Sequence, residues 1–206
     1  MAIRSRVLHE TPSQTAGPFV HIGCTPNRIG LAYAYRGQDL GERLFDNGVP
    51  GQRIVVEGCV FDGIGTPVKD GMVEIWQADH KGLFNSPQDR RGQSSLGFSG
   101  WGRQATDPET GEFSFRTIKP GETPFVDGRM QAPFISFWIV ARGVNLGLHT
   151  RMYFPDEAER NRQDPVLSKL EHACRIQTLI ASCVSDNHYR FDIRLQGEGE
   201  TVFFDV

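Results

Sequence analysis

Short apolar runs alternate with glycine-, proline- and aspartate-containing turns from residue 53 onward. Strand-length runs that are rich in β-branched and aromatic residues, and that such turns separate, are typical of a β-sandwich or barrel. The expected strands cover residues 53–61, 72–77, 112–117, 134–140, 149–154, 189–195 and 201–206. The run 134–140 is apolar on both faces, so we expect it to lie centrally in a sheet.

The run 189–195 alternates strictly between apolar and polar residues. Its apolar positions are expected to face inward, namely Tyr189, Phe191, Ile193 and Leu195. Residues 156–163 have a capping aspartate, early acids and later bases, which predict a short exposed helix. The glycine-rich stretch 97–102 predicts a loop lying over the sheet.

The first 50 residues lack a strand pattern and are rich in glycine, proline, asparagine and threonine, with one helical turn expected near residues 40–44. No linker divides the chain. The sequence therefore predicts one all-β domain, with an irregular N-terminal arm at 1–50, a β-sandwich core at 51–206 and a short helical insertion. An irregular arm of this length needs partners for its backbone groups, which suggests a role at an interface.

The composition and the lack of certain sequence patterns argue against several classes of function. The chain has 206 residues, of which 22 are basic and 25 acidic, and no basic stripe is visible, so nucleic acid is not an expected partner. No apolar run reaches the length of about 18 residues that a membrane span needs. No secretory signal is recognisable, which favours a cytoplasmic protein. The four cysteines form no Cys-x-x-Cys pair and are expected to be reduced thiols.

Residue chemistry alone offers few candidates for a site. His149 and Tyr153 lie four positions apart on one strand, a separation of about 13 Å that is too long for a shared metal ion. Residues 62–65 contain Gly-x-Gly, but a strand follows rather than a helix, so a hairpin turn is expected. Arg142 follows the central apolar run, where an arginine can meet an anion at the rim of a sheet or form an ordinary surface ion pair.

Several segments, in order along most of the chain, resemble the intradiol ring-cleaving dioxygenases. They are 11–23 (TPSQTAGPFVHIG), 58–63 (GCVFDG), 73–79 (VEIWQAD), 82–84 (GLF), 115–121 (FRTIKPG), 148–154 (LHTRMYF) and 189–205. The resemblance implies a β-sandwich enzyme that opens a catechol ring between its two hydroxylated carbons. Enzymes of this family use a non-heme Fe(III), held by two tyrosinates and two histidines.

The positions that match those four ligands hold other residues here. Phe84 and Thr123 stand at the tyrosine positions, and Phe134 and Ser136 stand at the His-x-His positions. Hard Fe(III) favours anionic oxygen ligands, which these side chains do not supply. The resemblance therefore implies an alpha subunit with no metal and no catalytic residue of its own, paired with a beta chain that binds the Fe(III).

The same resemblance implies a place for this chain at the substrate pocket between the two subunits. The matching residues near the substrate are Thr15, Gly17, Pro18 and Arg142. The implied reaction converts protocatechuate and O2 to 3-carboxy-cis,cis-muconate, a step of aromatic catabolism in the β-ketoadipate pathway. The ring carboxylate of this small aromatic substrate gives Arg142 a reason to face the pocket.

Two alternatives stay open from the sequence. One is a self-sufficient enzyme with a relocated metal site, which the scattered histidines disfavour. The other is a non-enzymatic, transthyretin-like β-sandwich that serves as a binding module.

Overall fold

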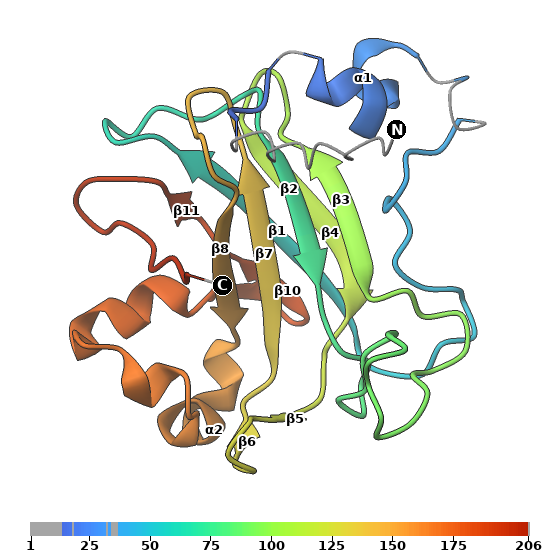
Figure 1. Cartoon of the computed structure of the whole chain (residues 1–206), viewed down its shortest axis with the longest axis vertical. Helices are drawn as coiled ribbons and strands as arrows, with labels where there is room; N and C mark the ends of the chain where they lie inside the picture. Colours follow the sequence, from blue (N-terminus) through green and yellow to red (C-terminus); the bar gives the residue numbers. More distant parts are fainter. Residues whose placement is uncertain (1–13, 18, 32, 34–36, 206) are drawn as a thin grey trace, which may run out of the picture.

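Two β-sheets pack face to face in the computed structural model, which describes residues 14–17, 19–31, 33 and 37–205 (Figure 1). The first sheet contains β1 (Arg53–Phe61), β4 (Glu112–Ile118), β9 (Ser182–Ser185), β10 (His188–Arg190) and β11 (Ile193–Arg194). The second has the order β3 (Trp101–Ala105), β2 (Met72–Trp76), β7 (Phe134–Val140) and β8 (Leu148–Tyr153). A small pair, β5 (Thr123–Pro124) and β6 (Met130–Gln131), lies beyond the end of β7.

The remaining elements are short helices. They are α1 (Val20–Cys24), α2 (Ala158–Gln163) and the 3₁₀ helices η1 (Pro26–Ile29), η2 (Pro155–Glu157), η3 (Leu167–Lys169) and η4 (Ala173–Leu179). Figure 1 shows α2 and the segment after it beside the β7–β8 edge of the second sheet, whereas α1 lies at the opposite end of the molecule. No helix in the described ranges is long and apolar enough to cross a membrane.

The core lies between the inner faces of the two sheets. Alternate residues of β2, β7 and β8 meet alternate residues of β1, β4 and β10, as period-two strands require. The aromatic centre includes Phe113, Phe137 and Phe191, whose rings lie at tilted contact distances of 5.2–5.9 Å. The all-β fold, the sandwich core and the helical insertion are therefore confirmed, and the division into an arm and a core at residue 50 stays a prediction.

A side chain interrupts the expected strand at 189–195. β10 and β11 both pair in parallel with β1, and between them the carboxylate of Asp192 accepts the N–H of Cys59 at 3.0 Å. Gly58 allows this approach, because a Cβ there would lie 1.9 Å from the carbonyl oxygen of Phe191. The inward positions Tyr189, Phe191 and Ile193 are buried as predicted, and Leu195 packs against the core.

Three local predictions are wrong. Residues 40–44 form turns rather than helix, because the carbonyl of Gly41 accepts the N–H of Arg103 and holds the segment against β3. The loop expected at 97–102 ends early, since β3 begins at Trp101 and Gly102 makes room for Leu44. Residues 201–205 contain a single bridge, from Phe204 to β8, rather than a strand, and Val206 lies outside the described residues.

Candidate functional site

Thr15 of the N-terminal arm holds the loop that carries Arg142. Its hydroxyl donates to the carbonyl of Ala141 at 3.2 Å and accepts the N–H of Gly143 at 2.7 Å. The loop follows β7, and Thr15 fixes the backbone on both sides of the arginine. The structure therefore brings together two of the residues that the sequence placed at the substrate pocket.

The guanidinium of Arg142 is exposed and close to one carboxylate. Its Nη2 atom lies 3.2 Å from Oδ2 of Asp70, with side-chain exposures of 76% and 44% respectively. An exposed ion pair of this kind contributes about 0–1 kcal/mol, so Arg142 is free to exchange this partner for another anion. Gly17 has nothing within 4 Å of where its Cβ would be, and Pro18 lies outside the described residues.

His21 binds the N-terminal arm to the turn that contains Asp70. Its ring is buried, with Nδ1 2.8 Å from the hydroxyl of Thr25 and Nε2 3.1 Å from the carbonyl oxygen of Asp70. Nη1 of Arg28 lies 2.7 Å from the same Nε2 atom. Burial lowers the pKa of His21, Arg28 lowers it further, and the hydrogen bond to Asp70 acts in the opposite direction. Asp70 therefore joins the arm, through its carbonyl, to Arg142, through its carboxylate.

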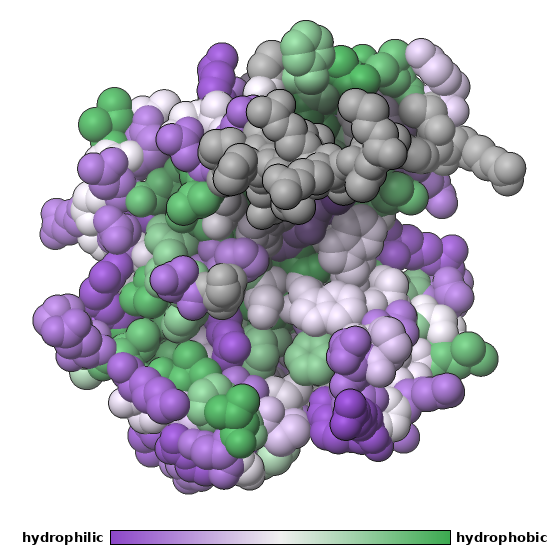
Figure 2. Space-filling view, in the orientation of Figure 1, coloured by the Kyte–Doolittle hydropathy of each residue, from purple (hydrophilic) through white to green (hydrophobic). Residues whose placement is uncertain are grey.

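The four substituted ligand positions converge on the outer face of the second sheet. Ser136 pairs with Trp76 on one side and with Arg151 on the other. Phe134 lies two residues before Ser136 on the same face of β7, and Phe84 stacks on Trp76 with ring centroids 5.9 Å apart. Thr123 is connected to this group by Gln131 of β6, whose Nε2 donates to the hydroxyl of Thr123 at 3.1 Å and whose Oε1 accepts from Arg151. In Figure 2 this face shows a mixture of apolar, pale and polar side chains.

The convergent group does not suit Fe(III). Its members offer two benzyl rings and two hydroxyls in place of phenolates and imidazoles. Tyr153 is the phenol beside Phe134, and it points to Asp164, to which its hydroxyl donates at 3.4 Å. Burial, followed by the charge of Asp164, raises the pKa of Tyr153, which keeps this phenol neutral. The described residues also contain no cluster of three or more histidine, cysteine, aspartate or glutamate side chains that could hold a metal elsewhere.

The loop that carries Phe84 is held by two carboxylates. Buried Asp79 accepts the N–H groups of Lys81, Leu83 and Ser95 and the Ser95 hydroxyl, at 2.8–3.0 Å. The hydrogen bond from Arg91 is the largest of the effects that lower the pKa of Asp89 to about 2. Asp89 Oδ2 also accepts the N–H of Phe84 at 2.9 Å, so the backbone around Phe84 is held by hydrogen bonds although it has no regular secondary structure.

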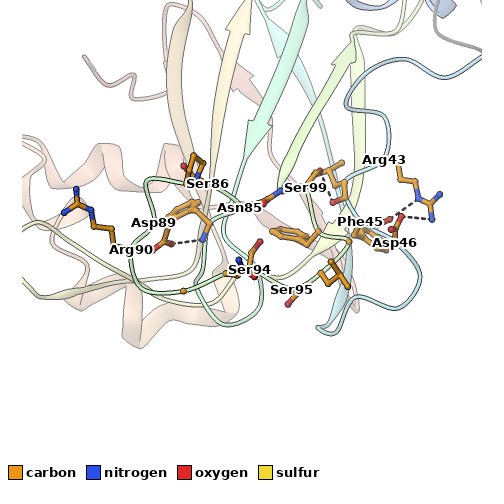
Figure 3. Close-up of a pocket in the computed structure, with 18 residues that line it drawn as sticks. Arg43, Phe45, Asp46, Asn85, Ser86, Asp89, Arg90, Ser94, Ser95 and Ser99 are labelled. Carbon is orange, nitrogen blue, oxygen red and sulfur yellow. Dashed lines mark hydrogen bonds and ion pairs between the residues drawn. The ribbon is translucent and has the colours of Figure 1, made fainter.

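A cavity of about 820 Å³ opens between this loop and residues 43–46. Figure 3 shows that serine hydroxyls and the ion pair of Arg43 with Asp46 lie around it. Phe84 lines one side, whereas Thr15 and Arg142 are not among its lining residues. The cavity is therefore separate from the place where the sequence put the substrate.

Comparison with known proteins decides the family. A family model described as "Dioxygenase" matches residues 30–197. The alpha chain of protocatechuate 3,4-dioxygenase from Pseudomonas putida is 46% identical over 202 residues, which cover 97% of this chain and 98% of that protein. The chain belongs to the intradiol ring-cleaving dioxygenases. It is a subunit of such an oxidoreductase, as the sequence predicted.

Two further relatives within this family extend the comparison. The beta chain of protocatechuate 3,4-dioxygenase from Burkholderia cepacia is 34% identical over 173 residues, covering 79% of this chain and 73% of that protein. The solved dioxygenase domain of a carbohydrate-binding fusion from Streptomyces sp. SirexAA-E is 26% identical, with a TM-score of 0.53 over 75% of this chain and 86% of that one. The alternative of a non-enzymatic binding module has no support in these comparisons.

The sequence named Thr15 and Arg142 as residues near the substrate, which stays a prediction, and gave no sign of their contacts with Ala141, Gly143 and Asp70. His21 was one of several scattered histidines, and Asp70 was part of a turn signal. Neither has a spacing that predicts a contact with the other. Arg151 was likewise one arginine within an expected strand, and only the register of β7 with β8 places it beside Ser136.

Proposed function

We propose that this chain is the alpha subunit of a protocatechuate 3,4-dioxygenase and acts with a beta chain that holds the non-heme Fe(III). The observation that carries the proposal is the 46% identity, over 97% of the chain, to a protein of that name. The loss of all four ligand types, at positions that come together in the fold, gives independent support. The assembly converts protocatechuate and O2 to 3-carboxy-cis,cis-muconate in the cytoplasm, within the β-ketoadipate pathway.

The contribution of this chain is the recognition of the substrate carboxylate. Arg142 carries an exposed guanidinium that is bound only to a half-exposed Asp70 within the described residues. A guanidinium and a carboxylate form two parallel hydrogen bonds, so the ring carboxylate of protocatechuate is a suitable competitor for Asp70. Thr15, whose hydroxyl binds the backbone of this loop, belongs to the arm together with Gly17; Pro18 completes the proposed substrate-binding set. No catalytic residue is assigned to this chain.

The partner chain is expected to be related in fold. The 34% identity to a beta chain supports a hetero-oligomer of two homologous sandwiches. Exposed apolar side chains of the arm segment, Phe19, Ile22, Ile29 and Tyr33, support a role in contacting that partner. We assign residues 1–50 to this interface arm and 51–206 to the sandwich.

Co-expression with a beta chain tests the function directly. The purified complex should consume O2 with protocatechuate and form 3-carboxy-cis,cis-muconate, and it should show the absorption of a tyrosinate–Fe(III) centre. This chain purified alone should be colourless and inactive. Tight stoichiometric iron on the isolated chain, or a pure complex without activity toward protocatechuate, would overturn the proposal.

A further inference from the structure

Arg151 lies beside three of the four substituted ligand positions. It is the cross-strand neighbour of Ser136, and its guanidinium carbon lies 4.1 Å from the ring centroid of Phe134. Its Nη1 donates to Oε1 of Gln131 at 2.8 Å, and Nε2 of Gln131 donates to the hydroxyl of Thr123 at 3.1 Å. One cation is therefore linked to three of the four positions: to Phe134 by the ring contact, to Thr123 through the amide of Gln131, and to Ser136 by strand pairing.

The surroundings of this cation contain aromatic rings and neutral acceptors. The ring of Phe204 lies 5.7 Å from the guanidinium carbon, so Arg151 has two benzyl faces at cation–π distance. No carboxylate of the described residues lies within ion-pair distance of Arg151. Both ends of the Gln131 amide form hydrogen bonds: Oε1 accepts from Arg151, and Nε2 donates to Thr123 and also to the carbonyl of Pro124 at 3.2 Å. The side chains of Arg151, Gln131 and Thr123 therefore form hydrogen bonds with one another and with the backbone, and no metal ion is needed to pair them.

We infer that the guanidinium of Arg151 takes the place of a metal ion in this chain. It supplies the positive charge around which the substituted positions pack, and it excludes iron electrostatically even where metal ligands are restored. A trivalent cation bound next to Ser136 and Phe134 would lie beside a guanidinium that is partly withdrawn from solvent, where charge repulsion is strong. The inference rests on the proposed metal-free role and goes beyond it, because it assigns the loss of metal binding to a fifth residue.

Restoring the ligands in two backgrounds tests the inference. The substitutions Phe84→Tyr, Thr123→Tyr, Phe134→His and Ser136→His are combined with Arg151 retained, or with Arg151→Met, which keeps most of the stem. Iron per complex is measured against the unaltered alpha–beta complex, in which all iron belongs to the partner. We expect no added iron while Arg151 is present, and about one added iron with new tyrosinate absorption after Arg151→Met. Equal iron uptake in both backgrounds would overturn the inference, whereas an inactive or unassembled unaltered complex would instead overturn the proposed function.

A single substitution covers the case in which the restored chains do not fold. Arg151→Met in the otherwise unaltered complex should lower Tm by about 3–6 °C, because the charged centre of the packed group is lost. The matched control is Arg194→Met, since Arg194 also lies over a ring, 5.1 Å from the centroid of Phe61, but is exposed. The control should lower Tm by less than about 2 °C. Equal shifts for the two variants, or a higher Tm for Arg151→Met, would show that the guanidinium is not the centre of the site.

Discussion

Thr15→Val separates two roles for the arm. Valine has nearly the shape of threonine but lacks the hydroxyl, so the substitution removes both hydrogen bonds to the loop of Arg142 and little else. The substitution would lower activity if Thr15 contacts the substrate directly, and it would also do so if Thr15 positions Arg142. The two roles predict different effects of Thr15→Val on activity when the Arg142 guanidinium has already been removed.

The expected magnitude follows from the geometry. Each hydrogen bond contributes about 0.5–1.5 kcal/mol, and the lower end applies because Thr15 is exposed in the chain. The loss of both contacts should therefore cost about 1 kcal/mol of transition-state stabilisation, which corresponds to about a fivefold lower kcat/KM for protocatechuate. Catechol should change little, because it carries no carboxylate for Arg142 to bind. Thr15→Ser keeps the hydroxyl and should restore most of the loss.

A double-mutant cycle on the assembled enzyme provides the assay. Steady-state O2 uptake is measured for Thr15→Val, Arg142→Met and the double variant with both substrates. If Thr15 acts through Arg142, the double variant should be no worse than Arg142→Met alone, because the contact that Thr15 orients is already missing. Additive losses, or an equal loss for catechol, would show that Thr15 acts independently of Arg142.

Three further outcomes are expected. Arg142→Met should lower kcat/KM for protocatechuate by about ten- to a hundredfold, with little change for catechol or in the stability of the complex; equal losses for both substrates would make the arginine structural. Gly58→Ala should reduce the free energy of unfolding by about 2–3 kcal/mol in chemical denaturation, because its Cβ would overlap a backbone carbonyl, whereas Gly48→Ala has open space and serves as control. The lowered pKa of His21 means that the unfolded state binds more protons, so the arm contact should be stable above pH about 6.5 and weaken as pH falls toward the lowered pKa. Hydrogen exchange of residues 20–29 should show this loss, and a dependence that persists in His21→Gln would contradict the assignment.

The sandwich was predictable because short apolar runs of strand length are separated by turn residues along most of the chain. The expected bounds 53–61 and 134–140 agree with β1 and β7. Failures occurred where a tertiary contact replaced a local signal. Asp192 takes the N–H of Cys59 and interrupts an otherwise regular strand, and Gly102 sits in β3 because Leu44 fills the space of a side chain.

The candidate site was predictable only in part, for a similar reason. The ligand positions and Arg142 could be located because they belong to sequence segments with a family resemblance. The contacts of Thr15 with Ala141 and Gly143 join residues that are far apart in the chain. Arg151 required the register of two strands, which apolar periodicity alone does not specify.

The position of β1 constrains when the protein can fold. This strand is synthesised early, yet it pairs with β4 on one edge and with β10 and β11 on the other. Val60 in β1, for example, can pair only after Ile193 has been synthesised. Pairings between distant segments are slow to form, because a long loop must close before any contact is gained. The first sheet can therefore be completed only when the C-terminal segment has left the ribosome. Until then one edge of β1 is exposed, and the nascent chain is vulnerable to aggregation in the period before it meets its partner.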